Sequence, residues 1–234
     1  MLNTGVPPAG VREEAPGRPH PRVQDRFGLL LFLVVASFLE QGFGDALWVS
    51  VLGTALFVLA LVVGFRASGV GKRPAFLAVT IGLSLGAVAL FGVSGGSGPL
   101  FGAACVVLVL LGSAVLASVL GRVLRHRTVT AQTLLGAASS YMLIGLTFAA
   151  VYGALDGLLA QPIFGHHVAG SVYGYFSFTT MTTVGYGDYT LKLDIARRIA
   201  MLQAVSGQLF LATLVARLVS LYRGGRRGAK DADV

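Results

Sequence analysis

The stretch Thr180-Met181-Thr182-Thr183-Val184-Gly185-Tyr186-Gly187-Asp188 lies near the C-terminal end of a 234-residue chain, between two long apolar segments. Two glycines, a tyrosine and a carboxylate are rarely found together at the depth of a lipid bilayer. Irregular backbone is tolerated there only where it is buried in protein or lines a water-filled path. The stretch therefore predicts a loop that borders an aqueous path through a membrane protein.

The composition of the chain is that of a membrane protein. Hydrophobic residues make up 55% of the chain and charged residues 12%, whereas soluble domains carry about 25% charged residues. Mean hydropathy is +0.77, and apolar runs recur with the length of about 20 residues that crosses a hydrocarbon core. The single cysteine, Cys105, lies in an apolar run, so we expect neither a disulfide within the chain nor a thiol-based metal site.

The net charge of +8 indicates membrane topology and not a nucleic-acid partner. Basic residues cluster at alternate ends of the apolar runs, and such residues favour cytoplasmic loops. The clusters are Arg12, Arg18, Arg22 and Arg26; Arg66, Lys72 and Arg73; Arg122, Arg125 and Arg127; and Arg217, Arg223, Arg226, Arg227 and Lys230. This pattern predicts an even number of crossings with both termini in the cytoplasm. Lys192, Arg197 and Arg198 are exceptions on the predicted outer side.

Six apolar segments have the length of membrane spans. We predict spans at about 27–44, 46–65, 74–93, 99–121, 130–153 and 196–221. The first is interrupted by Glu40, which must lie at the outer interface or face protein. A basic tail before a short apolar run also resembles a cleaved signal peptide, and its removal would leave the remaining topology unchanged.

The fourth span carries no charge between Leu100 and Leu120. A voltage-sensing helix needs arginines, because each charge moved through the field contributes about 2.3 kcal/mol per 100 mV. We therefore predict no voltage sensor of that kind, and interpret the arginines just past this span as topology anchors. Gly82 and Gly86 in the third span have the spacing of a close helix contact.

These patterns predict five regions along the chain. They are a disordered cytoplasmic tail at 1–25, a four-helix transmembrane domain at 26–121, a cytoplasmic linker at 122–129, a pore domain at 130–222 and a short cytoplasmic tail at 223–234.

The segment Val168–Thr182 is apolar and aromatic but too short to cross a bilayer. A helix of about 10 to 12 residues would enter from outside and end at mid-depth, with the negative end of its dipole toward the membrane centre. After it, Gly185 and Gly187 permit positive φ, so successive carbonyl oxygens can face one axis. Together with the Thr183 hydroxyl, these oxygens suit a hard cation.

The segment Tyr175–Asp188 resembles the pore helix and selectivity filter of bacterial potassium channels. Thr183–Gly187 is the signature by which such filters are defined. Farther along, Gly207–Ala212 and Val215–Val219 resemble the inner helix of that family. The resemblance covers about 130–222, whereas the earlier spans match only in number and topology.

This resemblance implies an all-α membrane protein with six transmembrane helices and a re-entrant pore helix and filter between the fifth and sixth. Each chain supplies one quarter of an ion ring, so it also implies a homotetramer. The implied function is passive conduction of K⁺ across the cell membrane, without catalysis and without a cofactor apart from the permeant ion. The implied partners are K⁺ and membrane lipid.

The resemblance also implies roles for individual residues. K⁺ would be held by the carbonyls of Thr183, Val184, Gly185 and Tyr186 and by the Thr183 hydroxyl, with Gly187 completing the filter. The filter would be supported by Tyr175, Phe176, Thr179 and Asp188, with Tyr186 braced against the first two. Gly207 would be a gating hinge, and the central cavity or inner gate would be faced by Gln208, Leu211 and Val215.

Alternatives stay open for the inner-helix residues. Gly207 has the alternative interpretation of a helix-packing glycine. Leu211 and Val215 have that of ordinary packing residues, because helical spacing does not choose the pore face.

Two positions depart from the family pattern. Thr179 stands where several members carry a glutamate that braces the filter aspartate, so Asp188 needs another partner or stays solvated. Leu191 stands in a region where the family often has a proline, which we interpret as a change in the outer mouth.

Other functions fit less well. A non-selective cation channel would lack the filter tyrosine, and an ion-transporter subunit usually holds four such repeats. An intramembrane hydrolase would need a base near Ser139 and Ser140. His166 and His167 at the predicted outer mouth are candidates for sensing external pH or are simply polar surface, and His126 in the basic linker is a weaker candidate.

Overall fold

The computed structural model of the chain describes residues 27–43, 46–67, 74–94, 97–125 and 131–231. The predicted N-terminal tail and half of the predicted linker, with His126, lie outside these residues. The described elements are α1 (Phe27–Leu39), the 3-10 turn η1 (Glu40–Phe43), α2 (Leu47–Ala67), α3 (Pro74–Ser94), α4 (Gly98–Arg125), α5 (Ala131–Leu158), α6 (Gly170–Met181) and α7 (Asp194–Asp231). Apart from the connecting loops, the described residues are helical, and they contain no strand.

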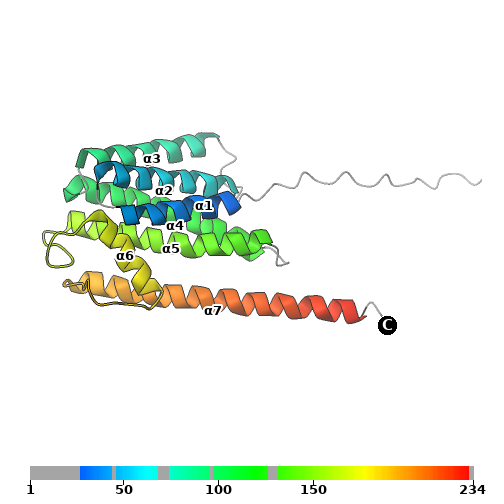
Figure 1. The fold of residues 1–234 in the computed structure, drawn as a ribbon. Coiled ribbons are helices and arrows are strands. Elements are labelled where there is room, and N and C mark those ends of the chain that lie inside the picture. The colour runs from blue at the N-terminus through cyan, green and yellow to red at the C-terminus, as the bar shows by residue number, and fades with distance from the viewer. Residues whose placement is uncertain (1–26, 44–45, 68–73, 95–96, 126–130, 232–234) are drawn as a thin grey trace, which may run out of the picture.

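The long helices lie roughly along one common axis (Figure 1). Helices α1 to α5 form a bundle, α7 lies beside α5, and α6 is inclined between α5 and α7. The loop before α6 and the start of α7 lie at one end of the molecule, and the C-terminus lies at the other. This arrangement places α6 and the following loop beside α7, at the edge of the bundle.

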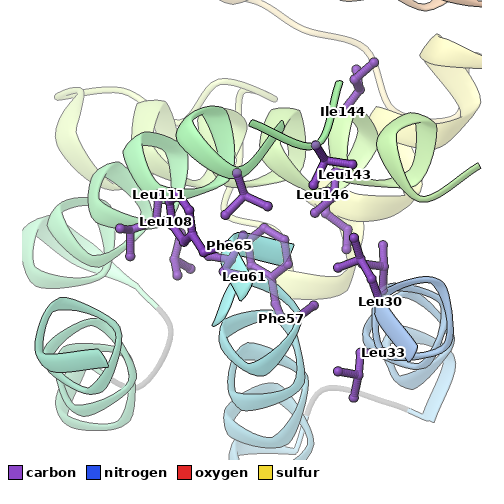
Figure 2. Close-up of a cluster of buried hydrophobic side chains, with 14 of the residues drawn as sticks. Leu30, Leu33, Phe57, Leu61, Phe65, Leu108, Leu111, Leu143, Ile144 and Leu146 are labelled. Carbon is purple, nitrogen blue, oxygen red and sulfur yellow. The ribbon is translucent and has the colours of Figure 1, made fainter. Parts of the chain in front are cut away.

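One apolar core joins α1, α2, α4 and α5. Figure 2 shows Leu30 from α1, Leu61 from α2, Leu108 from α4 and Leu143 from α5 directed into the same space. All four side chains are buried. In a bilayer such contacts act through close van der Waals packing, because lipid tails are as apolar as leucine.

Glycines bring α4 and α5 into backbone contact at one end. A Cβ added to Gly157 would lie 2.7 Å from the Cα of Gly102, and small residues of this kind allow membrane helices to approach closely. Gly82 and Gly86 meet nothing within 4 Å of such a Cβ. The close helix contact that their spacing allows is therefore not made among the described residues.

The helices confirm the membrane class but not the number of spans. Three are long and apolar enough to cross a bilayer, namely Gly98–Leu124, Ala131–Leu158 and Asp194–Arg217. Shorter apolar helices cover Phe27–Leu39, Val51–Ala67 and Thr80–Leu90 within the described ranges. Six crossings stay a prediction.

Three of the described helices extend a turn or more past the predicted spans. α5 continues to Leu158, α4 continues to Arg125 into the predicted linker, and α7 continues to Asp231 through most of the predicted tail at 223–234. The predictions followed the apolar runs, which are bounded by the hydrocarbon core. A helix can continue beyond that core, because leucine, alanine, lysine and arginine are good helix formers.

Glu40 faces protein at the end of α1. Its side chain fills the space over Gly53 of α2, where an added Cβ would collide with it. Its Oε2 is buried without a hydrogen-bond partner, and it borders a cavity of about 120 Å³ that also reaches Ser171 of α6.

Candidate pore loop

The loop after α6 begins by capping that helix. The backbone amide of Thr182 donates to the Phe178 carbonyl at 2.9 Å. The amides of Val184 and Gly185 both donate to the Thr179 carbonyl, at 2.9 and 3.1 Å. The last carbonyls of a helix have no partner within it, so here the loop itself supplies the donors. The first residues of the loop are therefore fixed relative to α6.

The sign of the backbone angle φ then alternates along the loop. Thr183, Gly185 and Gly187 have φ values of 63°, 51° and 79°, whereas Val184 and Tyr186 stay outside the positive region. A backbone that alternates between right- and left-handed conformations turns successive amides to one side, so we expect the carbonyls of this loop to face the opposite side. The predicted use of positive φ at the two glycines is thus observed.

Thr183 is the one described non-glycine residue with positive φ. A β-branched residue is an outlier in this region, and such backbone costs about 1–3 kcal/mol. Its hydroxyl donates to the Thr182 carbonyl at 2.6 Å, which leaves the lone pairs of the oxygen free to accept or to bind a cation.

Asp188 has a partner that the sequence did not reveal. The Tyr175 hydroxyl donates to Asp188 Oδ2 at 2.8 Å, and this bond raises the pKa of Tyr175 to about 12. The same Tyr175 ring stacks on Tyr186, with centroids 6.3 Å apart and planes 8° from parallel. One side chain of α6 therefore contacts both the tyrosine and the aspartate of the loop. The resemblance implied the contact with Tyr186 but not the bond to Asp188.

Phe176 lies elsewhere. Its ring centroid is 5.0 Å from that of Tyr152 and 5.3 Å from that of Phe164. It thus packs behind α6 against α5 and the preceding loop. The predicted contact of Phe176 with Tyr186 is not formed within one chain.

The Thr179 side chain bonds within α6 and not to Asp188. Its hydroxyl donates to the carbonyls of Tyr175 and Phe176 at 3.0 and 3.1 Å, a common bond of threonine within a helix. Its contribution to the loop comes from its carbonyl, which accepts the two amides described above.

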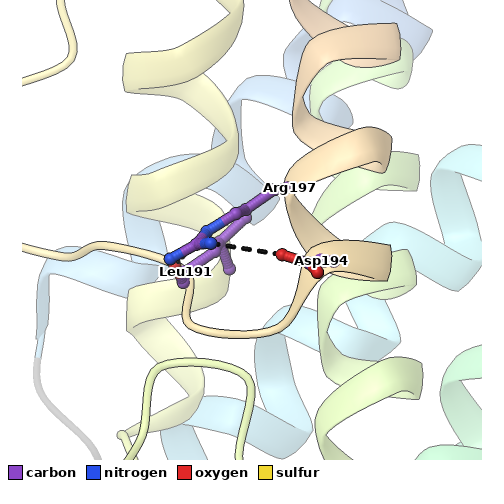
Figure 3. A network of polar contacts seen from close by, with 3 residues as sticks. All are labelled: Leu191, Asp194 and Arg197. Carbon is purple, nitrogen blue, oxygen red and sulfur yellow. Dashed lines mark hydrogen bonds and ion pairs between the residues drawn. The ribbon is translucent and has the colours of Figure 1, made fainter.

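The segment between Asp188 and the start of α7, here called the outer connection because it is predicted to lie on the outer side, ties the loop to α7. Leu191 is buried, and its carbonyl accepts from Arg197 Nε at 2.9 Å (Figure 3). Arg197 also pairs with Asp194 at 3.2 Å. The amide of Lys192 donates to the carbonyl of Ile163 at 2.7 Å. Arg197, one of the basic residues that depart from the predicted topology, thus has a structural role in this connection.

The predicted gating residues lie on α7 close to the end of α6. A Cβ on Gly207 would lie 2.7 Å from Met181 Cγ and 3.2 Å from its carbonyl oxygen, which is the contact expected of a packing glycine. Gln208 Nε2 lies 3.4 Å from the same oxygen. Leu211 is half-buried and Val215 is 57% exposed. The hinge at Gly207 and the cavity-facing roles of the other three stay predictions.

A buried polar cluster behind α6 was missed. It consists of Tyr152 from α5, Ser177 from α6 and Gln203 from α7, joined by hydrogen bonds. The available signal was a pair of glutamines in the apolar part of α7, Gln203 and Gln208, because polar side chains in membrane helices bond across to neighbouring helices.

Asp156 holds the loop between α5 and α6. Its Oδ2 accepts from the Tyr173 hydroxyl and its Oδ1 from the Ile163 amide, both at 2.8 Å. His166 and His167 lie in this loop with exposed side chains. Within the described ranges, no group of three or more His, Cys, Asp and Glu side chains is placed to hold a metal ion.

Comparison with known families bears on this region. Residues 140–223 match a family model described as an ion channel. The match supports an ion-channel family and includes most of α5, all of α6, the loop and most of α7. The helices before α5 lie outside it. A comparison with curated proteins found no match.

Proposed function

We propose that this protein is a potassium-selective channel subunit that conducts K⁺ passively through a homotetrameric pore. The observation that carries the proposal is the alternating φ at Thr183, Gly185 and Gly187, within the filter signature and directly after α6. This backbone favours a row of carbonyl oxygens on one side of the loop. Such oxygens replace the hydration shell of a permeating K⁺.

The tetramer is proposed from what one chain leaves exposed. Val184 and Tyr186 are 50% and 72% exposed, although neither side chain favours water. In the apolar part of α7 only 11% of the residues are buried, against 50% in α5. Four copies around one axis would cover these surfaces and complete a closed ring of carbonyls.

The proposed topology has six crossings, both termini in the cytoplasm and α6 as a re-entrant helix. The length of α6, 12 residues, corresponds to about 18 Å, which suits a helix that ends near mid-bilayer. Its C-terminal end would then present partial negative charge toward a cation in the pore. The uncharged stretch of α4 supports gating without voltage-sensing arginines.

A flux assay on purified protein in liposomes tests the proposal. We expect K⁺ to pass far faster than Na⁺ and the protein to have the mass of four chains in detergent. Comparable fluxes of the two ions would favour a non-selective cation channel. No flux of either ion under any voltage or pH would contradict a channel altogether.

A further inference from the structure

Gln203 is a buried polar residue in the middle of a membrane-length helix. Its side chain is 0% exposed and lies where α7 meets α5 and α6. Its Oε1 accepts from the Tyr152 hydroxyl at 2.7 Å. Its Nε2 donates to the carbonyl and the hydroxyl of Ser177, at 3.0 and 2.6 Å.

The cluster extends to a second point on α5. The Ser177 hydroxyl, which accepts from Gln203, donates in turn to the Gly145 carbonyl at 2.7 Å. Because a backbone carbonyl only accepts, the amide nitrogen of Gln203 must face Ser177 and the amide oxygen must face Tyr152. The hydrogen bonds therefore run in one direction from Tyr152 to Gly145, and they need a side chain with both a donor and an acceptor at position 203.

The Ser177 end of this cluster is close in sequence to the start of the loop. Ser177 lies two residues before Thr179, whose carbonyl holds the amides of Val184 and Gly185. A short rigid helix transmits any rotation at Ser177 to Thr179, because the two lie within one turn. The same cluster therefore fixes the starting point of the loop.

We infer that Gln203 is a positioning residue that locks α6 between α5 and α7 and thereby sets the geometry of the K⁺-conducting loop. The inference rests on the proposed function, because its readout is ion selectivity. Gln203 contacts neither the loop nor a permeating ion. It acts through Ser177 and the backbone of α6.

Gln203→Leu removes the donor and the acceptor and leaves Tyr152 and Ser177 without their partner. We expect the K⁺/Na⁺ flux ratio in liposomes to fall about tenfold, the change that corresponds to one buried hydrogen bond left unmade. Tyr152→Phe removes one bond of the cluster and should lower the ratio by a smaller factor.

Gln203→Glu gives a sharper test, because the introduced carboxyl group changes its hydrogen bonding with pH. When protonated it has an O–H donor and a carbonyl acceptor, one donor fewer than the amide of glutamine, which donates twice to Ser177. When ionised it has no donor for the Ser177 carbonyl. Tyr152 on α5 is the titratable side chain that contacts this position, and α6 presents Ser177. The selectivity of Gln203→Glu, divided by that of the wild type at each pH, should rise toward one as pH is lowered from about 9 to 5.

Ser140→Ala is the matched control. Its hydroxyl is buried on α5, like that of Tyr152, but donates to the Gly136 carbonyl of the same helix at 2.8 Å. We expect the control to keep wild-type selectivity at every pH. A pH-independent ratio for Gln203→Glu, or wild-type selectivity in Gln203→Leu, would overturn the positioning role. A wild type that passes Na⁺ as well as K⁺ would instead contradict the proposed function.

Discussion

Within α5 to α7, buried side-chain hydrogen bonds join one helix to the next, whereas α1, α2, α4 and α5 share a core that is largely apolar. In that core, hydrogen bonds from Ser37 to Gly53 and from Ser139 to Phe27 also cross between helices. The Tyr152–Gln203 and Ser177–Gly145 bonds belong to the first group. The core around Leu61 and Leu108 belongs to the second. The ion-channel family match covers the first region and leaves α1 to α4 outside.

The two kinds of contact differ in how strongly they depend on orientation. A hydrogen bond weakens steeply when its angle changes, whereas apolar contact is non-directional. A loop that must align several carbonyl oxygens needs fixed orientations, and α6 has them through its side chains and its C-terminal carbonyls. In the proposed channel, α1 to α4 surround the pore without forming it, so the non-directional contacts of their core suffice there.

The largest effect should follow from Gly185→Ala. No atom lies within 4 Å of an added Cβ, so the cost comes from the φ of 51°, which alanine tolerates poorly. Strain of about 1–3 kcal/mol would break the alternation, and we expect K⁺ flux to fall by about 5- to 150-fold.

Gly82→Ala is the matched control for that change. Gly82 also meets nothing within 4 Å, but it lies in α3 without positive φ. K⁺ flux in liposomes should stay at the wild-type level. An equal loss of K⁺ flux in Gly185→Ala and Gly82→Ala would mean that the loop is no more sensitive to an added methyl group than α3.

Gly157→Ala should have the next largest effect, and on stability. The added methyl group would meet the Gly102 backbone at 2.7 Å, which cannot move as a flexible side chain can. Overpacking of this kind costs about 1–3 kcal/mol. We expect a lower unfolding temperature in detergent but an unchanged K⁺/Na⁺ ratio per folded channel. A changed ratio would show that the α4–α5 contact also sets the loop.

The sequence predicted the elements of the pore region well, because local signals specify them. The positions of α5, α6 and α7 follow from apolar runs, and positive φ at Gly185 and Gly187 follows from residue type. The potassium assignment itself stays a prediction. The helix ends at Leu158 and Asp231 were missed because an apolar run marks a bilayer and not a hydrogen-bonded helix.

The contacts behind the loop could not be predicted from sequence. Tyr175 with Asp188, and Tyr152 with Gln203, are pairs of residues 13 and 51 positions apart. Nothing in their local sequence specifies which rotamers meet. The spacing of Gly82 and Gly86 predicted a contact that the chain does not make, while Gly102 and Gly157 form one without any shared motif.

Tyr175→Phe should have a moderate effect on the loop. It removes the hydroxyl that donates to Asp188 but keeps a ring that can stack on Tyr186. We expect selectivity to remain and the steady flux to change by a factor of about 3 to 10, as for one exposed charge-assisted bond. In the wild type this bond should persist as the pH is raised from about 7 to 10, because the pKa of Tyr175 is raised to about 12. A flux identical to wild type would show that the Tyr175–Asp188 bond does not support the loop.

Asp194→Asn should have the smallest effect, because it removes only an exposed ion pair. The Arg197–Asp194 pair has both side chains exposed, and pairs of this kind contribute about 0–1 kcal/mol. Arg197 would keep its bond to the Leu191 carbonyl, so the outer connection should hold. We expect an unfolding temperature within a few degrees of the wild type and unchanged selectivity, measured in parallel with Arg197→Gln, which also removes the bond to Leu191. If both variants behave alike, the carbonyl bond contributes no more than the exposed ion pair. A larger loss in Arg197→Gln would assign the outer connection to the directional contacts of the pore region.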